Sequence, residues 1–143
     1  NFSDCDLRGL ELRSAQLSGV DLSGCDFSYS EISAARFEEA ILIGSIFSDI
    51  KDGLGIAPSF KKATLWGAKF ERVQFLSAKF DEASLDRTTI RDSSLTAASF
   101  VGATWSKLVF ENVRISTRSN LPQGIAWSPA IEKDFSAAKA ATK

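Results

Sequence analysis

The chain has 143 residues, of which 44% are hydrophobic and 24% charged, a composition that suits one folded domain and excludes a disordered polymer. The formal net charge of −1 excludes a uniformly charged surface, but the charges are unevenly divided. Residues 1–50 hold nine acids and three bases, whereas residues 51–143 hold nine acids and fourteen bases. No apolar run reaches membrane-spanning length, so we expect no membrane insertion.

Large apolar residues recur at every fifth position from Phe2 to Phe47 and again from Phe60 to Ile115. All of these centres are Leu, Phe, Ile or Trp, and the residue two places before each centre is usually small. A single strand or helix would carry such a period onto several faces. Short extended pieces that all turn the same way bring every centre to one axis, so the period predicts a solenoid.

Several of these five-residue units resemble the pentapeptide-repeat signature, an Ala-Asp-Leu-x-x-like unit repeated in tandem. The units that carry the resemblance include Leu10-Glu11-Leu12-Arg13-Ser14, Val20-Asp21-Leu22-Ser23-Gly24 and Cys25-Asp26-Phe27-Ser28-Tyr29. The resemblance covers residues 1–117 and implies an all-β fold, a right-handed quadrilateral β-helix with four pentapeptides per coil. Glycine is common at the last position of a unit, where a corner needs a permissive backbone.

Four pentapeptides per coil would place every fourth centre in one column. The predicted columns are Phe60, Phe80 and Phe100; Leu65, Leu85 and Trp105; Phe70, Ile90 and Phe110; and Phe75, Leu95 and Ile115. In this register Phe80 points inward and Asp81 faces water.

Residues 49–59 interrupt the repeat. Phe47 and Phe60 are thirteen positions apart, eight more than one unit, and two glycines and a proline mark a loop. The loop is either a functional segment or a tolerated insertion at a corner. Three isoleucines precede it at outward positions, and Ile50, Leu54 and Ile56 are expected to fold back over them. The candidate partner-binding residues are Ile41, Ile43, Ile46, Leu54 and Ile56.

Residues 118–143 lie outside the repeat and form the second predicted unit. Residues 120–124 are typical of a turn, and Ser128-Pro129 is typical of a helix start. An apolar stripe at helical spacing follows, formed by Ile131, Phe135, Ala138 and Ala141. We expect an α-helix that caps the last coil, with a partner-binding helix as the alternative.

The two cysteines, Cys5 and Cys25, are four units apart in the sequence. The family geometry would put them one coil apart at small inward positions, with Cα atoms about 4.8 Å from each other. Parallel stacked side chains keep their Cβ atoms further apart than the roughly 3.8 Å that a disulfide prefers. Two buried free thiols are therefore expected rather than a bridge.

The inventory of reactive groups argues against catalysis. The chain has no histidine, which removes the commonest general base and metal ligand, and two cysteines cannot complete a four-thiolate zinc site. Adjacent acids such as Glu38-Glu39 and Asp81-Glu82 are typical of solvated repeat corners. We expect no enzyme activity, cofactor or metal.

Two functional classes remain. The first is a non-enzymatic structural or protein-interaction module that is monomeric and binds no nucleic acid. The second is a DNA-mimicking inhibitor of an enzyme such as gyrase, which some relatives in the resembled family act on; this job requires extended negative potential. The short rod with one loop and a terminal helix also resembles small pentapeptide-repeat proteins of the plant thylakoid lumen, which implies that location.

Overall fold

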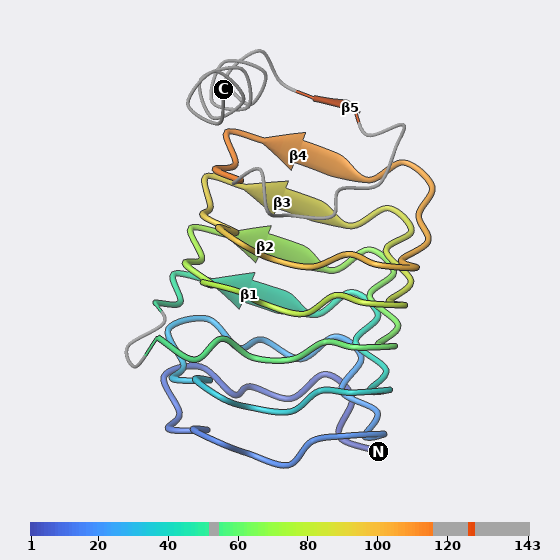
Figure 1. The fold of residues 1–143 in the computed structure, drawn as a ribbon. Coiled ribbons are helices and arrows are strands. Elements are labelled where there is room, and N and C mark those ends of the chain that lie inside the picture. The colour runs from blue at the N-terminus through green and yellow to red at the C-terminus, as the bar shows by residue number, and fades with distance from the viewer. Residues whose placement is uncertain (52–54, 116–125, 128–143) are drawn as a thin grey trace.

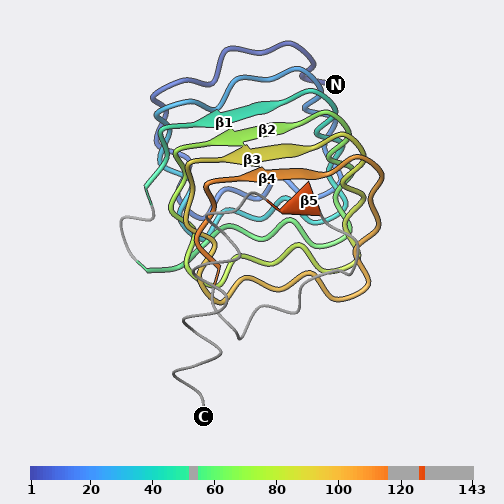
Figure 2. The same ribbon diagram turned by 90° about the horizontal axis from the view of Figure 1, so that it is seen from above.

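The computed structural model describes residues 1–51, 55–115 and 126–127 and shows a stack of coils (Figure 1). Short strands line one side of the stack: β1 (Ile46–Ser48), β2 (Lys69–Glu71), β3 (Thr89–Arg91), β4 (Val109–Glu111) and β5 (Ala126–Trp127). They pair in parallel in the order β1-β2-β3-β4-β5. Seen from above, the coils superimpose around a four-sided outline (Figure 2).

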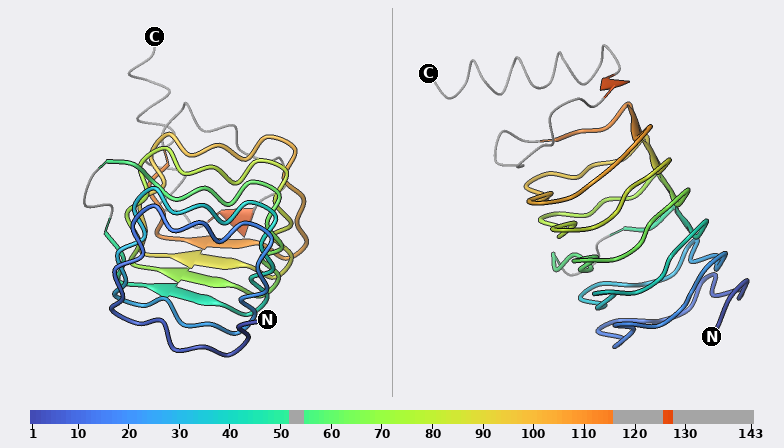
Figure 3. Two further views of the ribbon diagram at one scale, coloured as in Figure 1. Left: turned by 90° about the horizontal axis from the view of Figure 1, so that it is seen from below. Right: turned by 90° about the vertical axis from the view of Figure 1, so that its right-hand side faces the viewer.

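Isolated parallel bridges continue this pairing on the other sides. Partners are four units apart in most coils, as for Asp6 with Asp26 and Ser84 with Thr104. Each coil therefore consists of four five-residue sides, which stack along the axis (Figure 3).

We number the sides in chain order and define each by its column of centres. Side 1 has Phe2, Leu22, Leu42, Leu65, Leu85 and Trp105; side 2, which contains the strands, has Leu7, Phe27, Phe47, Phe70, Ile90 and Phe110; side 3 has Leu12, Ile32, Phe75, Leu95 and Ile115; and side 4 has Leu17, Phe37, Phe60, Phe80 and Phe100. Sides 1 and 3 are opposite, as are sides 2 and 4. The predicted columns are confirmed.

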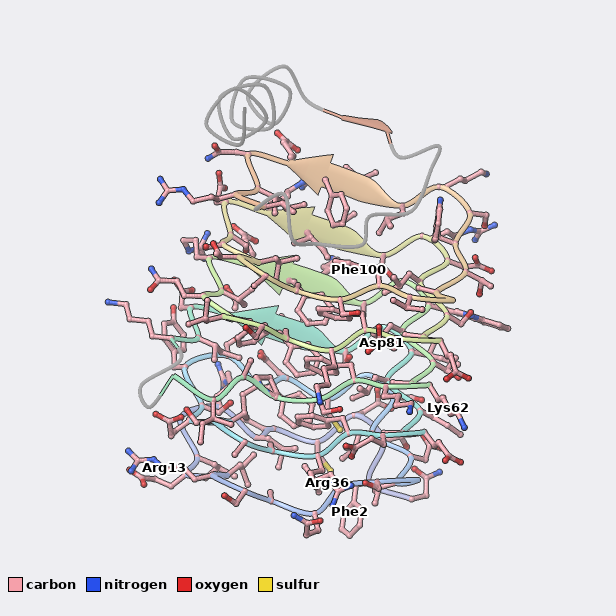
Figure 4. All side chains as sticks on the ribbon, viewed as in Figure 1. Phe2, Arg13, Arg36, Lys62, Asp81 and Phe100 are labelled. Carbon is pink, nitrogen blue, oxygen red and sulfur yellow. The ribbon has the colours of Figure 1, made fainter. Side chains whose placement is uncertain are left out.

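Phenylalanines from sides 2 and 4 meet in the middle of the solenoid. Phe27 and Phe47 stack with ring centroids 4.8 Å apart, close to the usual spacing of about 4.8 Å between neighbouring strands. Phe47 and Phe60, from opposite sides, meet edge to face at 5.4 Å. Both geometries are favourable for aromatic pairs. Figure 4 shows Phe100 inside the coil, whereas Arg13 extends from the surface.

Nearly every side ends in a corner with positive φ. The corner is the last residue of the unit, where non-glycine residues such as Ser77 and Asp92 have φ values of 63° and 48°. This left-handed conformation is disfavoured for residues with a Cβ atom. The preference for glycine at this position, as at Gly44, therefore follows from the backbone.

One coil is longer than the others. Ile41 pairs with Thr64 and Lys51 with Gln74, each three positions further along the chain than four units, whereas Ser59 and Lys79 are again four units apart. The additional residues therefore lie between Lys51 and Ser59 and number three, not the eight expected from the gap between centres. The sequence estimate was too high because five of those eight residues still supply side 3 of that coil.

Ile50 takes an inward position and is 1% exposed. The expectation that it folds back over the outward isoleucines is therefore wrong. The predicted capping helix lies outside the described residues, which include only β5 from residues 118–143. At the other end, the first coil is only partly buried, and its centre Phe2 is exposed.

Candidate interaction surface

Three large apolar side chains project from side 1. Ile41 and Ile43 flank the inward centre Leu42, so the alternation of an extended chain points both of them outward. Trp66 occupies the same unit position as Ile43 in the next coil. The exposed fractions are 38% for Ile41, 40% for Ile43 and 48% for Trp66. These residues, which we call the side-1 patch, stand where most units carry polar groups.

The corner beside the patch is formed by glycine in three consecutive coils. Gly24, Gly44 and Gly67 occupy the last unit position of side 1, and all three have φ between 65° and 70°. A shallow groove of about 490 Å³ beside Trp66 is lined by Ile43, Trp66, Gly67, Asp86, Arg87 and Ser106. The indole is held against the neighbouring coil, because Trp66 Nε1 donates to Ser84 Oγ at 2.6 Å. The centre of side 1 is therefore apolar and accessible, and Asp86 and Arg87 border it in the next coil.

Ile46 lies just beyond the Gly44 corner, at the start of β1 on side 2. It is half-buried and stacks between Asp26 and Lys69 of the adjacent coils. Ile46 thus extends the apolar surface around one corner. The three isoleucines that the sequence analysis grouped together do lie along one coil.

The loop residues do not join them. Ile56 is 58% exposed, and its backbone oxygen accepts a hydrogen bond from the Ala34 nitrogen on side 3. Side 3 is opposite side 1, so Ile56 cannot cover Ile41 or Ile43. Leu54 lies outside the described residues. Among the described residues, Ile56 therefore lies on a different surface from Ile41 and Ile43.

Sequence reasoning missed Trp66. A signal was available, because Trp66 precedes a corner glycine and follows the inward Leu65, which makes it an outward residue in the predicted register. Its position next to Ile43 depends on the three additional residues in the coil between them. In a coil of exactly four pentapeptides, the residue stacked on Ile43 would have been Ala63.

Charged residues on sides 2 and 4 alternate in sign from coil to coil. On side 2, Glu71, Arg91 and Glu111 stack directly, and Arg91 Nε lies 2.9 Å from Glu111 Oε2. On side 4, the successive corners are Glu39, Lys62 and Glu82. Opposite charges at about 4.8 Å attract weakly in water, so these surfaces are largely self-neutralised.

Arginines also pair with acids of the acid-rich half. The ion pairs are Arg8 with Asp6, Arg13 with Glu31, Arg36 with Glu38 and Arg72 with Asp49. Hydrogen bonds from Arg8 hold the pKa of Asp6 at about 2. Hydrogen bonds from Arg72 and then Ser48 hold the pKa of Asp49 at about 2. These carboxylates stay ionised at neutral pH, which suits ion pairing and not general acid catalysis.

The two cysteines are free thiols in the structure. Cys25 is buried, and its Sγ donates to the Phe2 carbonyl oxygen at 2.8 Å, whereas Cys5 is half-buried in the first coil. Burial raises the pKa of the Cys25 thiol. A buried, protonated thiol is unreactive, which suits a packing role.

Metal-ligating side chains are scattered over the described part of the chain. Within it, no group of three or more Cys, Asp or Glu side chains is arranged to hold a metal ion. Among the same residues, no helix has the length and apolar character needed to cross a membrane.

Comparisons with known proteins agree with the architecture. A family model for pentapeptide repeats matches residues 1–28 and 59–96 in 8 copies. A search of curated protein sequences finds no match. A trypsin-treated variant of QnrB1, a plasmid-mediated fluoroquinolone resistance protein, is similar in structure with a TM-score of 0.54 and 17% identity. That match covers 82% of this chain, which spans 65% of the QnrB1 chain.

A second trypsin-treated QnrB1 variant gives a TM-score of 0.54 at 16% identity and covers 92% of this chain and 90% of that one. A pentapeptide repeat protein from the thylakoid lumen of Arabidopsis thaliana gives a TM-score of 0.31 at 20% identity, over 86% of this chain and 72% of that one. The two QnrB1 matches have the same fold, and a right-handed crossover is the rule between parallel strands. Residues 1–28 and 59–96 therefore belong to the pentapeptide-repeat family, and the chain folds as a right-handed quadrilateral β-helix.

Proposed function

We propose that this protein is a non-enzymatic interaction module that binds a protein partner through side 1. The observation that carries the proposal is the side-1 patch: Ile41, Ile43 and Trp66 are exposed together at positions where most units carry polar residues. Exposed apolar clusters with a polar border are typical of protein-binding surfaces, and tryptophan is enriched among the residues that dominate binding energy.

The rest of the described surface offers less to a partner. Sides 2 and 4 carry the alternating charges, and several of these form ion pairs within the molecule. Of the other exposed apolar residues, Leu76 lies on side 3 in the coil after that of Ile56, and Val101 stands alone on side 4. Single exposed apolar residues are normal on soluble proteins.

Affinity capture from the native source tests the proposal. Immobilised wild-type protein should retain a protein that the Ile43→Lys variant does not retain. Leu76→Lys is the matched control, because Leu76 is also exposed and holds the same unit position on side 3. Equal capture by Ile43→Lys and wild type would overturn the assignment of side 1.

Ile56 and Leu54 stay a separate candidate contact. Ile56 is the most exposed of the predicted isoleucines, so a partner that binds the insertion would contact Ile56 on side 3. Capture that is lost in Ile56→Lys but retained in Ile43→Lys would favour this surface.

DNA mimicry is the alternative function, and the nine acids among residues 1–50 favour it. Four of these acids are paired with arginines, however, and the acidic coils are followed by coils with alternating charges. Inhibition of gyrase supercoiling that is lost at raised salt would support mimicry. The thylakoid-lumen location stays a prediction of the resemblance, and fractionation of the native source tests it.

A further inference from the structure

We propose that the partner of side 1 is a second copy of this chain, which packs side 1 against side 1 with the two solenoid axes antiparallel. The inference rests on the proposed function, since it names the protein that covers the patch. It replaces the sequence-based expectation of a monomer with a symmetric dimer.

Side 1 is suited to self-association because its six coils can pair completely. The two-fold axis runs along the strand direction, between the coils of Leu42 and Leu65. It reverses the order of the coils in the second copy, and each unit position faces the same unit position of that copy. Ile43 then lies over Trp66 of the second copy, and the reverse contact forms by symmetry. Both apolar residues leave water together, at the centre of the interface where desolvation matters most.

The corner column of side 1 carries a charge pattern that matches this arrangement. Its six residues are Asp4, Gly24, Gly44, Gly67, Arg87 and Lys107 in coil order. One acid stands at one end, two bases at the other, and three glycines between them. Reversing the coil order places Lys107 opposite Asp4 and Arg87 opposite Gly24 of the second copy.

Although Arg87 is opposite Gly24 of the second copy, it also faces a carboxylate. The Asp4 side chain lies over Gly24, and its Oδ1 is 2.1 Å from where a Cβ atom on Gly24 would stand. The Arg87 guanidinium would therefore face the Asp4 carboxylate across the interface. Neither Arg87 nor Lys107 forms an ion pair with another of the described residues, so both are available for a partner.

The same charges disfavour the parallel arrangement. A two-fold axis along the solenoid would place each coil opposite its own equivalent, so Asp21 would approach the Asp4 carboxylate over Gly24 of the second copy. Like charges that face each other across an interface oppose binding. In the antiparallel dimer Asp86 also approaches this carboxylate, but Arg87 and Lys107 face it as well, whereas in the parallel dimer no base faces it. The charge pattern thus favours the antiparallel dimer.

The interface is small. The six coils of side 1 span about 24 Å along the solenoid axis, and the three outward residues of each unit span about 10 Å across it. The area of this face is small compared with the roughly 800 Å² that each partner buries in a stable dimer. We therefore expect a weak dimer, with a dissociation constant of about 10 µM to 1 mM.

Sedimentation equilibrium of the purified full chain over about 10 µM to 1 mM tests the proposal. The weight-average mass should rise with concentration from that of the monomer toward twice that value. Ile43→Lys should abolish the rise, and Leu76→Lys should leave it unchanged. A monomer at every concentration, or a rise that Ile43→Lys does not affect, would overturn the proposal.

A charge exchange tests the antiparallel arrangement. Arg87→Asp and Asp4→Arg should each weaken association at least about tenfold, since each places like charges opposite one another. The double variant should recover association, because the facing charges are opposite again. Circular dichroism confirms that each variant is folded. Failure of the double variant to recover would overturn the antiparallel contact.

The outcome separates this inference from the proposed function. If the purified chain is monomeric but Ile43→Lys loses a different protein in affinity capture, side 1 is an interaction surface and the homodimer is wrong. If Ile43→Lys changes neither capture nor mass, both proposals fail.

Discussion

Phe80 and Phe100 stack with ring centroids 5.0 Å apart and planes 4° from parallel, although four repeat units separate them in the chain. Phe60 stacks on the other face of Phe80 at 5.1 Å. The Phe80 ring is fully buried between them. Each coil of this fold is therefore held by side chains of the coils above and below, and a defect in one column affects three coils.

The Phe80→Asp variant should fail to fold, because it would bury an unpaired carboxylate and remove the stacked ring. Thermal unfolding monitored by circular dichroism measures this effect. Lys79→Asp is the matched control, since Lys79 is the adjacent exposed residue. Equal melting temperatures for the two variants would contradict the assigned register.

Asp81, the residue expected to face water, is less suitable as that control. It is only partly exposed, and its Oδ1 accepts hydrogen bonds from the Val101 nitrogen at 2.9 Å and from the Ser99 hydroxyl. Asp81 thus links two coils. The sequence showed that Asp81 was outward, but it could not show that an outward side chain turns along the axis to reach the next coil.

The core was predictable for a physical reason. In a solenoid every unit repeats one backbone conformation, so the position of Phe80 within its unit determines that it is inward. The candidate surface was less predictable, because it depends on which outward residues become neighbours. Ile43 meets Trp66 only through the three additional residues of one coil, and Ile56 is separated from both because the insertion lies on the opposite side.

The thiols should differ in reactivity. Cys25 is buried and its pKa is raised by burial, so it should react with a thiol reagent only after denaturation. Cys5 is half-buried in the first coil and should react slowly in the native protein. Reagent titration without reductant, with and without denaturant, measures both.

Cys5→Ser is the control for this experiment, since its single remaining thiol should be silent until the protein unfolds. A native mass lower by the two hydrogens lost on oxidation would instead show a disulfide between Cys5 and Cys25.

The ion pair of Asp49 and Arg72 should make stability depend on pH in acid. The pKa of Asp49 is about 2 in the folded protein against an ordinary value of 3.8. A lowered pKa stabilises the fold above pH 3.8, and this contribution disappears as the pH falls toward 2. Asp49→Asn should therefore lower the melting temperature at neutral pH and flatten its fall in acid.

Arg72→Gln provides the cross-check, because Arg72 is the main cause of the lowered pKa. It should reproduce the flattening, and the double variant should resemble Arg72→Gln, which also loses the ion pair between Arg72 and Glu71. An unchanged slope in Asp49→Asn would show that the pair does not contribute to acid stability.

The insertion offers a direct test of the coil architecture. Pairing of Lys51 with Gln74 and of Ser59 with Lys79 locates three additional residues between Lys51 and Ser59. Replacing residues 52–55 with a single leucine would leave Ile50, Lys51, the new leucine, Ile56 and Ala57 as one regular unit. The leucine would then be the centre of side 3 between Ile32 and Phe75.

This variant should fold and melt at a higher temperature than wild type, because it shortens a loop and gives side 3 of this coil a leucine centre. Thermal unfolding monitored by circular dichroism measures the change. A melting temperature well below that of wild type would show that the three additional residues are not confined to this segment.

Outright deletion of residues 50–57 is the contrasting variant, because it treats all eight residues as additional. It restores the spacing of five between Phe47 and Phe60, but it moves Phe60 from side 4 to side 3 and every later centre by one side. Phe60 would then stack on Ile32 and lose its contact with Phe37, whose ring centroid lies 5.1 Å from that of Phe60.

The deletion should therefore melt at a lower temperature than the leucine variant, since Leu65 and Leu85 would follow Phe37 in the column of side 4 and interrupt its run of stacked phenylalanines. Phe47 would exchange the stacked ring of Phe70, at 4.8 Å, for that of Phe75, because Phe70 would move to side 1 and Phe75 to side 2. The same shift carries Trp66 away from Ile43, so the deletion should abolish any concentration-dependent rise in mass. A deletion variant that melts as high as the leucine variant would show that the stacked phenylalanines of side 4 do not add to stability.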